Sequence, residues 1–522
     1  MKNKIIAVKN SKSSLKEPFI FLIIMIIAIF SRLYKFDVIP FGLNHDASLN
    51  GLVAIDLWQK LPFYTPYYSG WIGETFYHYW LVLNFLILGI GPETIKLASI
   101  TIGILTIPIF YLLAKSLQKK TVALFSLFFI ATSGWHIIMS KVGWLTILVP
   151  LFQSLTFFLL YSALKSGKKI FWIGAGISLA VTLNTYSAAK ITPLIIFLVL
   201  IFWYFKNRKD IKIKLFLLNI IIFIAAFLIA ILPLLNFVIR DWEIYSDRMN
   251  FLSVTNKIKE TGSLEPVLRN VTTSVGMLHF RANGDDFFIN EPLLEKIPGI
   301  IFLLGFLAIL FSVGKFESFF ILTWFFSGFI PGILSVPNGN HDFSILAPTY
   351  LIIGQGISII PLLFQRINKV FLPVSYFLVC LLLIMSFINT YQQYLSKDRR
   401  EIFGFYPEAT IVANKMKEFK NQYNFYLTGN YPRDILTFKT YSGGDPFEKH
   451  YIWLENAGEF LAVKPVSKKG LMFFMFPTSE NETVADNLLN KFTRAKKSYL
   501  WYRDDNIARI VSLVITVPSY EL

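Results

Sequence analysis

The chain has 522 residues, of which 54% are hydrophobic and only 16% are charged, and its mean hydropathy is +0.54. This composition excludes an ordinary soluble globular protein and indicates a polytopic membrane protein. The net charge of +17 does not indicate nucleic-acid binding, because the basic residues lie in short segments between apolar runs. The single cysteine, Cys380, lies within an apolar run, which excludes a disulfide within the chain and a cysteine-based metal site.

Apolar runs recur along about the first three-quarters of the chain, and a helix of about 20 apolar residues crosses a hydrocarbon core of about 30 Å. We keep the first run as a signal anchor, because Arg32 and Lys35 follow it without a small-residue cleavage site. The run 77–91 is shorter than a usual span and is expected to be interfacial or re-entrant, so the sequence predicts 11 or 13 crossings. The runs are 18–36, 77–91, 95–114, 121–139, 143–164, 170–188, 190–205, 215–238, 298–314, 317–335, 343–364 and 370–390.

Lysine and arginine residues distinguish the two faces of the membrane. They cluster before the first run and then in alternate connections, at 115–120, 165–169, 206–214 and 366–369. Short loops rich in these residues stay in the cytoplasm. The sequence therefore predicts a plasma-membrane protein with a cytoplasmic N-terminus. The segments predicted on the outer face are 37–76, 133–143, 184–190, 239–297, 336–342 and 391–522.

The composition changes near residue 393, where charged residues, asparagine and tyrosine rise and no run is long enough to span. Short apolar stretches predict buried strands, and helical periodicity appears in two further segments. We therefore expect a membrane module at 1–392, with outer-face loops at 37–76 and 239–297, and an extracytoplasmic α/β domain at 393–522. The expected strands are 424–427, 471–476 and 507–517, and the expected helices are 407–420 and 483–495.

Every histidine of the chain and many of its charged residues fall at the predicted outer face or in the exported domain. Polar groups gathered on one side of a helical bundle indicate a cavity open to that side. The alternative is that extracellular loops are simply polar. The residues are His45, His78, His136, His279, His341 and His450, together with Asp46, Glu74, Lys141, Lys190, Arg248, Arg281, Asp285 and Asp286.

Two carboxylates, Asp46 and Glu74, stand near the heads of predicted helices at this face, which is where we expect chemistry. Each has an alternative structural role. Asn44 or Asp46 suits the N-cap of an interfacial helix that runs from Ala47 to Lys60. Glu74 suits a polar rim position ahead of the helix that begins near Thr75.

A series of short motifs runs through residues 20–365, and their order carries more information than any one of them. They are Ser31-Arg32-Leu33, Gly42-Leu43-x-x-Asp46, Gly73-Glu74 ahead of Tyr79, Gly91 with Lys96-Leu97, Trp135-His136-x-x-x-Ser140-Lys141-x-Gly143, Asn184-Thr185-Tyr186-x-Ala188-Ala189-Lys190, Asn283-Gly284-Asp285, Trp324 to Pro331, and Pro337-Asn338-x-x-His341. In this order they resemble the GT-C superfamily of integral-membrane glycosyltransferases, in particular the protein mannosyltransferase and lipid A aminoarabinose transferase-like branch.

The chain departs from that family at four places. The family usually has Asp-Glu where this chain has Asp46-Ala47, and arginine where it has Lys141 and Lys190. An ammonium keeps the charge of a guanidinium but loses its bidentate phosphate contact. The family often has His-Arg where this chain has His341-Asp342, and a carboxylate there would repel a lipid phosphate, so Asp342 is left out of the predicted site.

The resemblance implies a GT-C fold and inverting transfer of a sugar from a polyprenyl-phosphate donor to a glycan, lipid or protein acceptor at the outer leaflet. Asp46 would act as general base, and Glu74 would position the acceptor or hold a metal with His78. These groups could hold Mg²⁺, Mn²⁺ or Zn²⁺. A reaction without a metal is also open. The residues expected to bind substrate are Lys141, Tyr186, Lys190, Arg248, Arg281, Asp285 and His341, whose cations would stabilise the leaving phosphate.

Three other functions remain open: a flippase or transporter of a lipid-linked saccharide, a polysaccharide ligase or polymerase with a diphosphate-linked donor, and an inactive relative that only binds lipid-linked sugar. A transporter carries ionisable groups near the middle of the membrane on broken helices. The predicted spans of this chain are almost free of charge at their centres, which favours the transferase.

Overall fold

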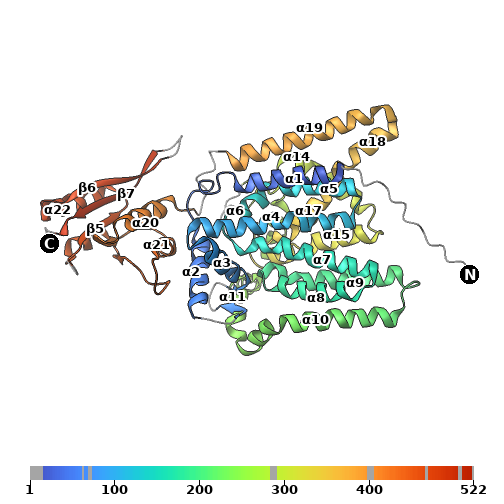
Figure 1. Cartoon of the computed structure of the whole chain (residues 1–522), viewed down its shortest axis with the longest axis horizontal. Helices are drawn as coiled ribbons and strands as arrows, with labels where there is room; N and C mark the ends of the chain where they lie inside the picture. Colours follow the sequence, from blue (N-terminus) through green and yellow to red (C-terminus); the bar gives the residue numbers. More distant parts are fainter. Residues whose placement is uncertain are drawn as a thin grey trace, which may run out of the picture.

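The computed structural model describes residues 16–60, 64–68, 73–282, 291–396, 405–464, 468–503 and 508–519. Long helices lie side by side along the longest axis, and a small sheet domain projects from one end of the bundle (Figure 1). Helix α1 begins at the opposite end. The long bundle helices are α1 (Lys16–Leu33), α4 (Pro92–Leu117), α5 (Lys120–Thr132), α7 (Leu148–Ser166), α8 (Lys169–Leu183), α9 (Thr192–Asn207), α10 (Ile213–Arg240), α14 (Lys296–Leu310), α15 (Phe316–Ser327), α17 (Leu346–Ile357), α18 (Ile359–Ile367) and α19 (Leu372–Thr390).

Shorter elements connect these helices. Helices α2, α3, α6 and α11 lie at the end that faces the sheet domain (Figure 1). The shorter elements are α2 (His45–Lys60), β1 (Tyr67–Tyr68), β2 (Gly73–Glu74), α3 (Phe76–Leu88), α6 (Gly134–Lys141), η1 (Leu145–Ile147), η2 (Ser187–Ile191), α11 (Trp242–Leu252), α12 (Val254–Thr261), α13 (Glu265–Gly276), α16 (Ile330–Leu334), η3 (Phe343–Ile345), η4 (Lys369–Phe371) and η5 (Tyr391–Leu395).

The surface of the bundle is apolar, as expected for a multi-pass membrane protein. Helix α10 leaves Ile221 61% and Ile229 69% exposed, and a large apolar surface of this kind indicates contact with membrane hydrocarbon. Among the described residues, seven helices are long and apolar enough to cross a membrane, or eight if the bent pair α5 and α6 counts as one. Helices α3, α8 and α14 are apolar but shorter. The expected 11 or 13 crossings stay a prediction.

The predicted apolar runs correspond in order to helices of the structure. The connections between the runs lie at two opposite ends of the bundle. The lysine-rich connections α7–α8 and α9–α10 lie at the end away from the sheet domain (Figure 1), while α3, the run too short to span, lies at the end that faces it. The run 121–139 is not one straight helix. It bends by 49° between α5 and α6, where the Ser133 side chain caps α6 by accepting from the His136 amide at 3.1 Å.

The C-terminal domain is a five-stranded mixed sheet in the order β4-β3-β5-β7-β6. β3 is parallel to β4 and β5, and β7 is antiparallel to β5 and β6. The expected strands and both expected helices are present, and α21, β4 and β6 were not predicted. The elements are α20 (Pro407–Phe419), β3 (Tyr423–Leu427), α21 (Arg433–Thr440), β4 (Ile452–Trp453), η7 (Ala457–Ala462), β5 (Gly470–Met475), α22 (Ser479–Lys491), β6 (Lys496–Arg503) and β7 (Ala508–Val517).

The central strand β5 is apolar along its whole length because both of its faces are covered. Met472 and Phe474 pack in the cluster that includes α20 and α21, whereas Leu471 and Phe473 pack in the cluster that includes α22. Alternate side chains of a strand point to opposite faces, so a fully apolar strand indicates two covering layers.

Helix α2 connects the sheet domain to the bundle. His45 Nδ1 lies 2.5 Å from Asp434 Oδ2 of α21, and Gln59 Nε2 donates to the Tyr441 hydroxyl at 2.8 Å. Between these contacts, a Cβ at Gly51 would stand 2.5 Å from the Phe438 ring, so only glycine permits this approach of α21. Residues 397–404, next to the predicted boundary at 392/393, lie outside the described residues, and the boundary stays a prediction.

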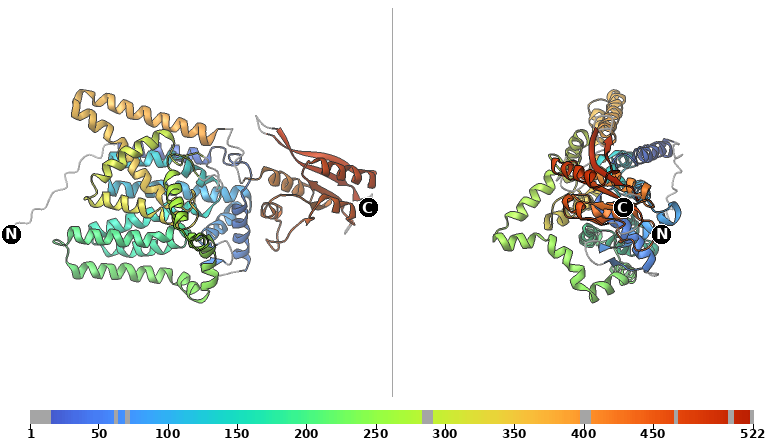
Figure 2. Two further views of the ribbon diagram at one scale, coloured as in Figure 1. Left: turned by 180° about the vertical axis from the view of Figure 1, so that it is seen from behind. Right: turned by 90° about the vertical axis from the view of Figure 1, so that its left-hand side faces the viewer.

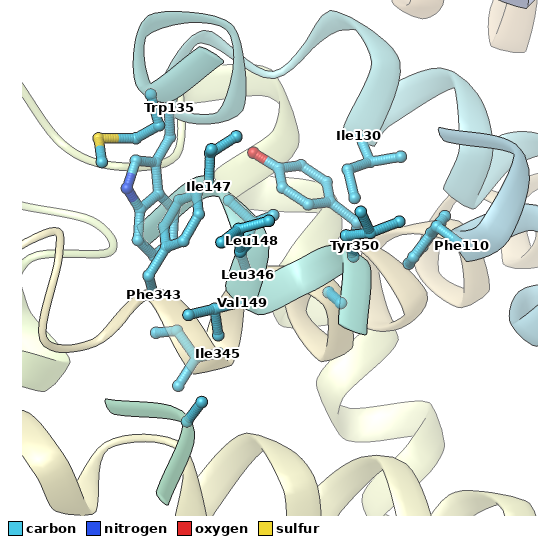
Figure 3. Close-up of a cluster of buried hydrophobic side chains, with 14 of the residues drawn as sticks. Phe110, Ile130, Trp135, Ile147, Leu148, Val149, Phe343, Ile345, Leu346 and Tyr350 are labelled. Atoms are coloured by element: carbon cyan, nitrogen blue, oxygen red, sulfur yellow. The ribbon is translucent and has the colours of Figure 1, made fainter. Parts of the chain in front are cut away.

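A buried core supports the end of the bundle nearest the sheet domain. Figure 3 shows Trp135 of α6 against Phe343 of η3, with ring centroids 5.3 Å apart, beside Ile147 and Leu148. Tyr350 of α17 donates its hydroxyl to Ser133. This packing fixes the broken helices α5 and α6 and the turn before α17, which carry the polar segments of that end.

Candidate functional site

An ion pair between Glu74 and Lys190 is the centre of the candidate site. Lys190 Nζ lies 2.7 Å from Glu74 Oε1, and the Glu74 side chain is only 3% exposed. The ammonium also lies 4.4 Å from the centroid of the Tyr245 ring, at cation–π distance. Glu74 comes from β2, Lys190 from η2 and Tyr245 from α11, so three distant segments meet here.

A small cavity adjoins this ion pair. Its volume is about 10 Å³, the space of about one water molecule. Tyr186 and Leu145 belong to its wall, and Tyr186 also lies beside His341, with ring centroids 6.2 Å apart. The predicted residues Glu74, Tyr186, Lys190 and His341 are therefore gathered at one place. The cavity is lined by Tyr67, Gly73, Glu74, Leu145, Tyr186, Ser187, Lys190, Tyr245 and Met249.

Asp46 is half-buried in the first turn of α2 and is not the helix cap. Asn44 takes that role, because its Oδ1 accepts from the Ala47 amide at 2.6 Å. The Asn44 side chain also donates to the Val142 carbonyl at 2.8 Å, which fixes α2 to the segment after α6. A carboxylate in the first turn of a helix is stabilised in its ionised form by the helix dipole.

The face of α2 that carries Asp46 points toward the start of α3. Asn50 follows Asp46 by one helical turn on the same face, and its Oδ1 lies 2.9 Å from Nε2 of His78 in the first turn of α3. Glu74 precedes that turn. The two predicted carboxylates thus belong to neighbouring segments, which the Asn50–His78 hydrogen bond helps to join.

The structure does not assemble a metal centre around Glu74 and His78. Within the described part of the chain, no group of three or more His, Cys, Asp and Glu side chains is arranged to hold a metal ion. The Lys190 ammonium stands against the Glu74 carboxylate, where it would repel a cation, and the His78 ring is engaged by Asn50. These residues do not fit a metal as they are arranged, and metal binding stays a prediction.

Lys141 lies in a second, separate group of buried cations. Its Nζ donates to the Tyr34 carbonyl at 2.9 Å, and Lys96 Nζ donates to the Pro40 carbonyl at 2.6 Å. Arg32 donates to the Ala131 carbonyl and to Nδ1 of His136. Lys141 and Lys96 fix the turn after α1, whereas Arg32 fixes the end of α1 to α5 and α6. The sequence did not reveal these functions for Arg32 and Lys96.

The remaining predicted residues lie at the same end of the bundle or outside the described set. Arg281 is exposed. Arg248 lies in α11, three residues after Tyr245, and its side chain is outside the described part of the chain. Asp285 lies outside the described residues. Asp342 is fully buried. Burial raises the pKa of the Asp342 carboxyl well above its ordinary value, and the neighbouring Ser274 and Gly332 offset this only in part.

Compared by sequence, the chain matches no protein-family model and no curated protein. Its structure is similar to the oligosaccharyltransferase AglB of Archaeoglobus fulgidus in complex with an inhibitory peptide and a dolichol-phosphate, with a TM-score of 0.55 and 13% identity over 95% of this chain and 74% of that chain. It is also similar to ArnT of Cupriavidus metallidurans bound to undecaprenyl phosphate, with a TM-score of 0.59 and 10% identity over 97% and 98% of the two chains.

Both neighbours are GT-C glycosyltransferases, so the expected GT-C fold is confirmed. The chain is a multi-pass membrane protein with this fold and a C-terminal mixed sheet. Its identity to these neighbours is low, so the likeness establishes the architecture and leaves the reaction to be argued from the residues.

Proposed function

We propose that this protein is an inverting glycosyltransferase, which moves a sugar from a polyprenyl-phosphate donor to an acceptor at the outer membrane face. The observation that supports this most directly is the grouping of Asp46, the Glu74–Lys190 ion pair and Tyr186 at one end of a GT-C bundle. The structures of AglB and ArnT were solved with dolichol-phosphate and undecaprenyl phosphate, respectively, and this lipid chemistry agrees with a donor of that class.

In the proposed step the acceptor hydroxyl attacks the anomeric carbon from the face opposite the phosphate. The new C–O bond forms as the bond to the phosphate oxygen breaks, and the bonding electron pair leaves with the polyprenyl phosphate. The hydroxyl proton passes to the carboxylate of Asp46, which acts as general base. Single displacement inverts the anomeric configuration.

Lys190 is proposed to receive the negative charge of the leaving phosphate. Its ammonium is held between Glu74 and the Tyr245 ring, so it is positioned before the donor arrives and loses little entropy on binding. Preorganised cations in a site that excludes water contribute most where charge develops. Glu74, in this proposal, orients Lys190 rather than a metal.

The test is mass spectrometry of lipid-linked sugars and surface glycans from cells with and without the protein. We expect a polyprenyl-phosphate sugar to accumulate when the protein is absent, while one sugar is missing from an acceptor glycan. Complementation with Asp46→Asn should leave both changes in place, because the base is lost. A flippase would instead alter the sidedness of the lipid-linked sugar with no covalent product, and that result would refute the proposal.

A further inference from the structure

A second cavity lies between the bundle and the sheet domain, at the other end of α2 from Asp46. Its volume is about 510 Å³, within the range of small-molecule sites. It shares no lining residue with the cavity beside Lys190, so the two cavities are distinct. Trp58 follows Asp46 by twelve positions in the helix, a rise of about 18 Å. It is lined by Trp58, Gln59, Ile90, Gly91, Pro92, Lys417, Phe438, Lys439, Tyr441, Ser442, Gly443 and Gly444.

The cavity is cationic. Lys417 and Lys439 line it, and no acidic side chain is among the described residues of its wall. Lys439 is largely buried and makes no hydrogen bond or ion pair with another described side chain or backbone group. Burial lowers the pKa of Lys439 to about 8, with Lys417 adding to the effect and Glu93 opposing it. Partial desolvation of an ammonium is unfavourable, and an anion in the cavity would offset this cost.

The cavity also has a flat aromatic surface. Trp58 is 46% exposed although it is a large apolar side chain, and Tyr441 is held by the hydrogen bond from Gln59. Gly443 and Gly444 have φ of +121° and +84°, and a Cβ at Gly443 would meet nothing within 4 Å, so a ligand can approach the backbone closely. A sugar ring offers an apolar C–H face and a polar rim, which match an indole ring surrounded by polar groups.

We propose that this cavity binds an anionic saccharide, whose phosphate or carboxylate pairs with Lys439 and Lys417 and whose ring lies against Trp58. Lysines alone would bind any anion, and a tryptophan alone would bind any flat apolar group. Lysines beside a tryptophan together favour an anionic sugar. The site spans both domains, because Trp58 belongs to α2 and both lysines belong to the sheet domain. Occupancy would therefore stabilise the docking of that domain on the bundle.

Binding is tested with the purified full-length protein by isothermal titration calorimetry. The probes are glucose 1-phosphate, glucuronate, glucose and inorganic phosphate. We expect saturable binding of at least one of the two anionic sugars, with a Kd at least tenfold lower than for glucose or phosphate. Lys439→Gln and Trp58→Leu should each weaken that binding at least tenfold, whereas Lys439→Arg should retain most of it.

Lys415→Gln is the matched control, because Lys415 lies on the same helix as Lys417 but pairs with Glu418 outside the cavity. It should bind like the unaltered protein, and so should Asp46→Asn, which separates this site from the proposed transfer. Thermal unfolding checks the fold, and the exposed Lys417→Gln replaces Lys439→Gln if that variant is unstable. Three results would overturn the proposal. They are equal affinity for phosphate and both anionic sugars, tight binding that Trp58→Leu leaves unchanged, and no saturable binding.

Discussion

The ammonium of Lys190 is neutralised by Glu74 before any donor arrives, and this changes how a lysine substitution must be interpreted. Removing one partner of a buried ion pair leaves the other charge uncompensated, at a cost of about 3 to 5 kcal/mol. The Glu74 carboxylate is 3% exposed, so Lys190→Met would leave it buried without its partner. A loss of donor binding in Lys190→Met alone could then not be distinguished from a loss of stability.

The informative comparison is therefore between Glu74→Gln and the double variant Glu74→Gln/Lys190→Met. If Lys190 contacts the donor phosphate, the double variant should bind a polyprenyl-phosphate sugar more weakly than Glu74→Gln by about 1.5 to 3 kcal/mol, the contribution of a charged hydrogen bond. Lys190→Arg should retain much of the affinity. Equal donor affinity in the two glutamine-containing proteins would leave Lys190 as an internal partner of Glu74 only.

Substitutions at Asp46 and Asn44 distinguish a catalytic function from helix capping. Asp46→Asn should keep donor binding and lower turnover by about 10² to 10⁴, the usual contribution of a positioned general base. Asn44→Ala removes the cap of α2 and should cost about 1 kcal/mol of stability with little loss of turnover per folded molecule. Measured transfer near the unaltered rate in purified Asp46→Asn would exclude Asp46 as the base.

At the level of single residues, the sequence predicted the end of the bundle at which polar groups lie but not how they pair. Asp46, Glu74, Tyr186, Lys190 and His341 were all expected at one end, because hydropathy and the lysine pattern locate that end. The Glu74–Lys190 contact joins segments more than 100 residues apart, and no local pattern encodes such a pairing. Lys141 was expected near the phosphate, yet it donates to the Tyr34 carbonyl, a partner that only the fold of the turn after α1 defines.

At the scale of elements, sequence periodicity predicted helices and strands correctly wherever one local pattern dominated. The buried strand β5 and the amphipathic helix α20 appear close to their expected bounds. The edge strand β6 was missed because it is polar and mostly exposed, as sheet edges often are. The bend at Ser133 was missed because the apolar run continues through it, while the break is caused by capping and by packing around Trp135.

Helix α2 connects the two domains through a titratable contact, His45 with Asp434. The hydrogen bond to the Asp434 carboxylate raises the pKa of His45 above its ordinary value of 6.5, although partial burial opposes this. A raised histidine pKa contributes stability that is fully present below pH 6.5 and is lost as the pH rises through the folded-state pKa. His45 is 56% exposed, so its contribution is screened and should stay below about 1 kcal/mol.

We therefore expect the docking of the sheet domain to weaken slightly as the pH rises above 6.5. Hydrogen exchange of α2 and α21, measured at several pH values and corrected for intrinsic rates, reports this directly. His45→Gln should remove the dependence and exchange at all pH values like the unaltered protein at high pH. The same slope in His45→Gln would assign the pH effect to another group.

At the scale of the whole molecule, the two ends of the bundle differ in chemistry. The end with the sheet domain carries the candidate site and the saccharide cavity, and the opposite end carries the lysine-rich turns (Figure 2). The bundle positions these ends about a membrane thickness apart, because helices such as α4, with 26 residues, span about 39 Å. Only the charge asymmetry of the loops indicates which end faces the cytoplasm.

That orientation can be tested by thiol labelling in intact cells, after Cys380, the one native cysteine, is replaced by serine. Tyr68→Cys lies in β1 at the end with the sheet domain, whereas Gly167→Cys and Asp210→Cys lie in lysine-rich turns at the other end. An impermeant thiol reagent should label Cys at 68 and leave 167 and 210 unlabelled until the membrane is opened. Because Tyr67, next to residue 68, lines the cavity beside Lys190, this result would also place the candidate site outside. Labelling of 167 and 210 in intact cells with 68 protected would invert the topology and place the transfer reaction on the cytoplasmic side, where the proposed outer-leaflet acceptor is absent.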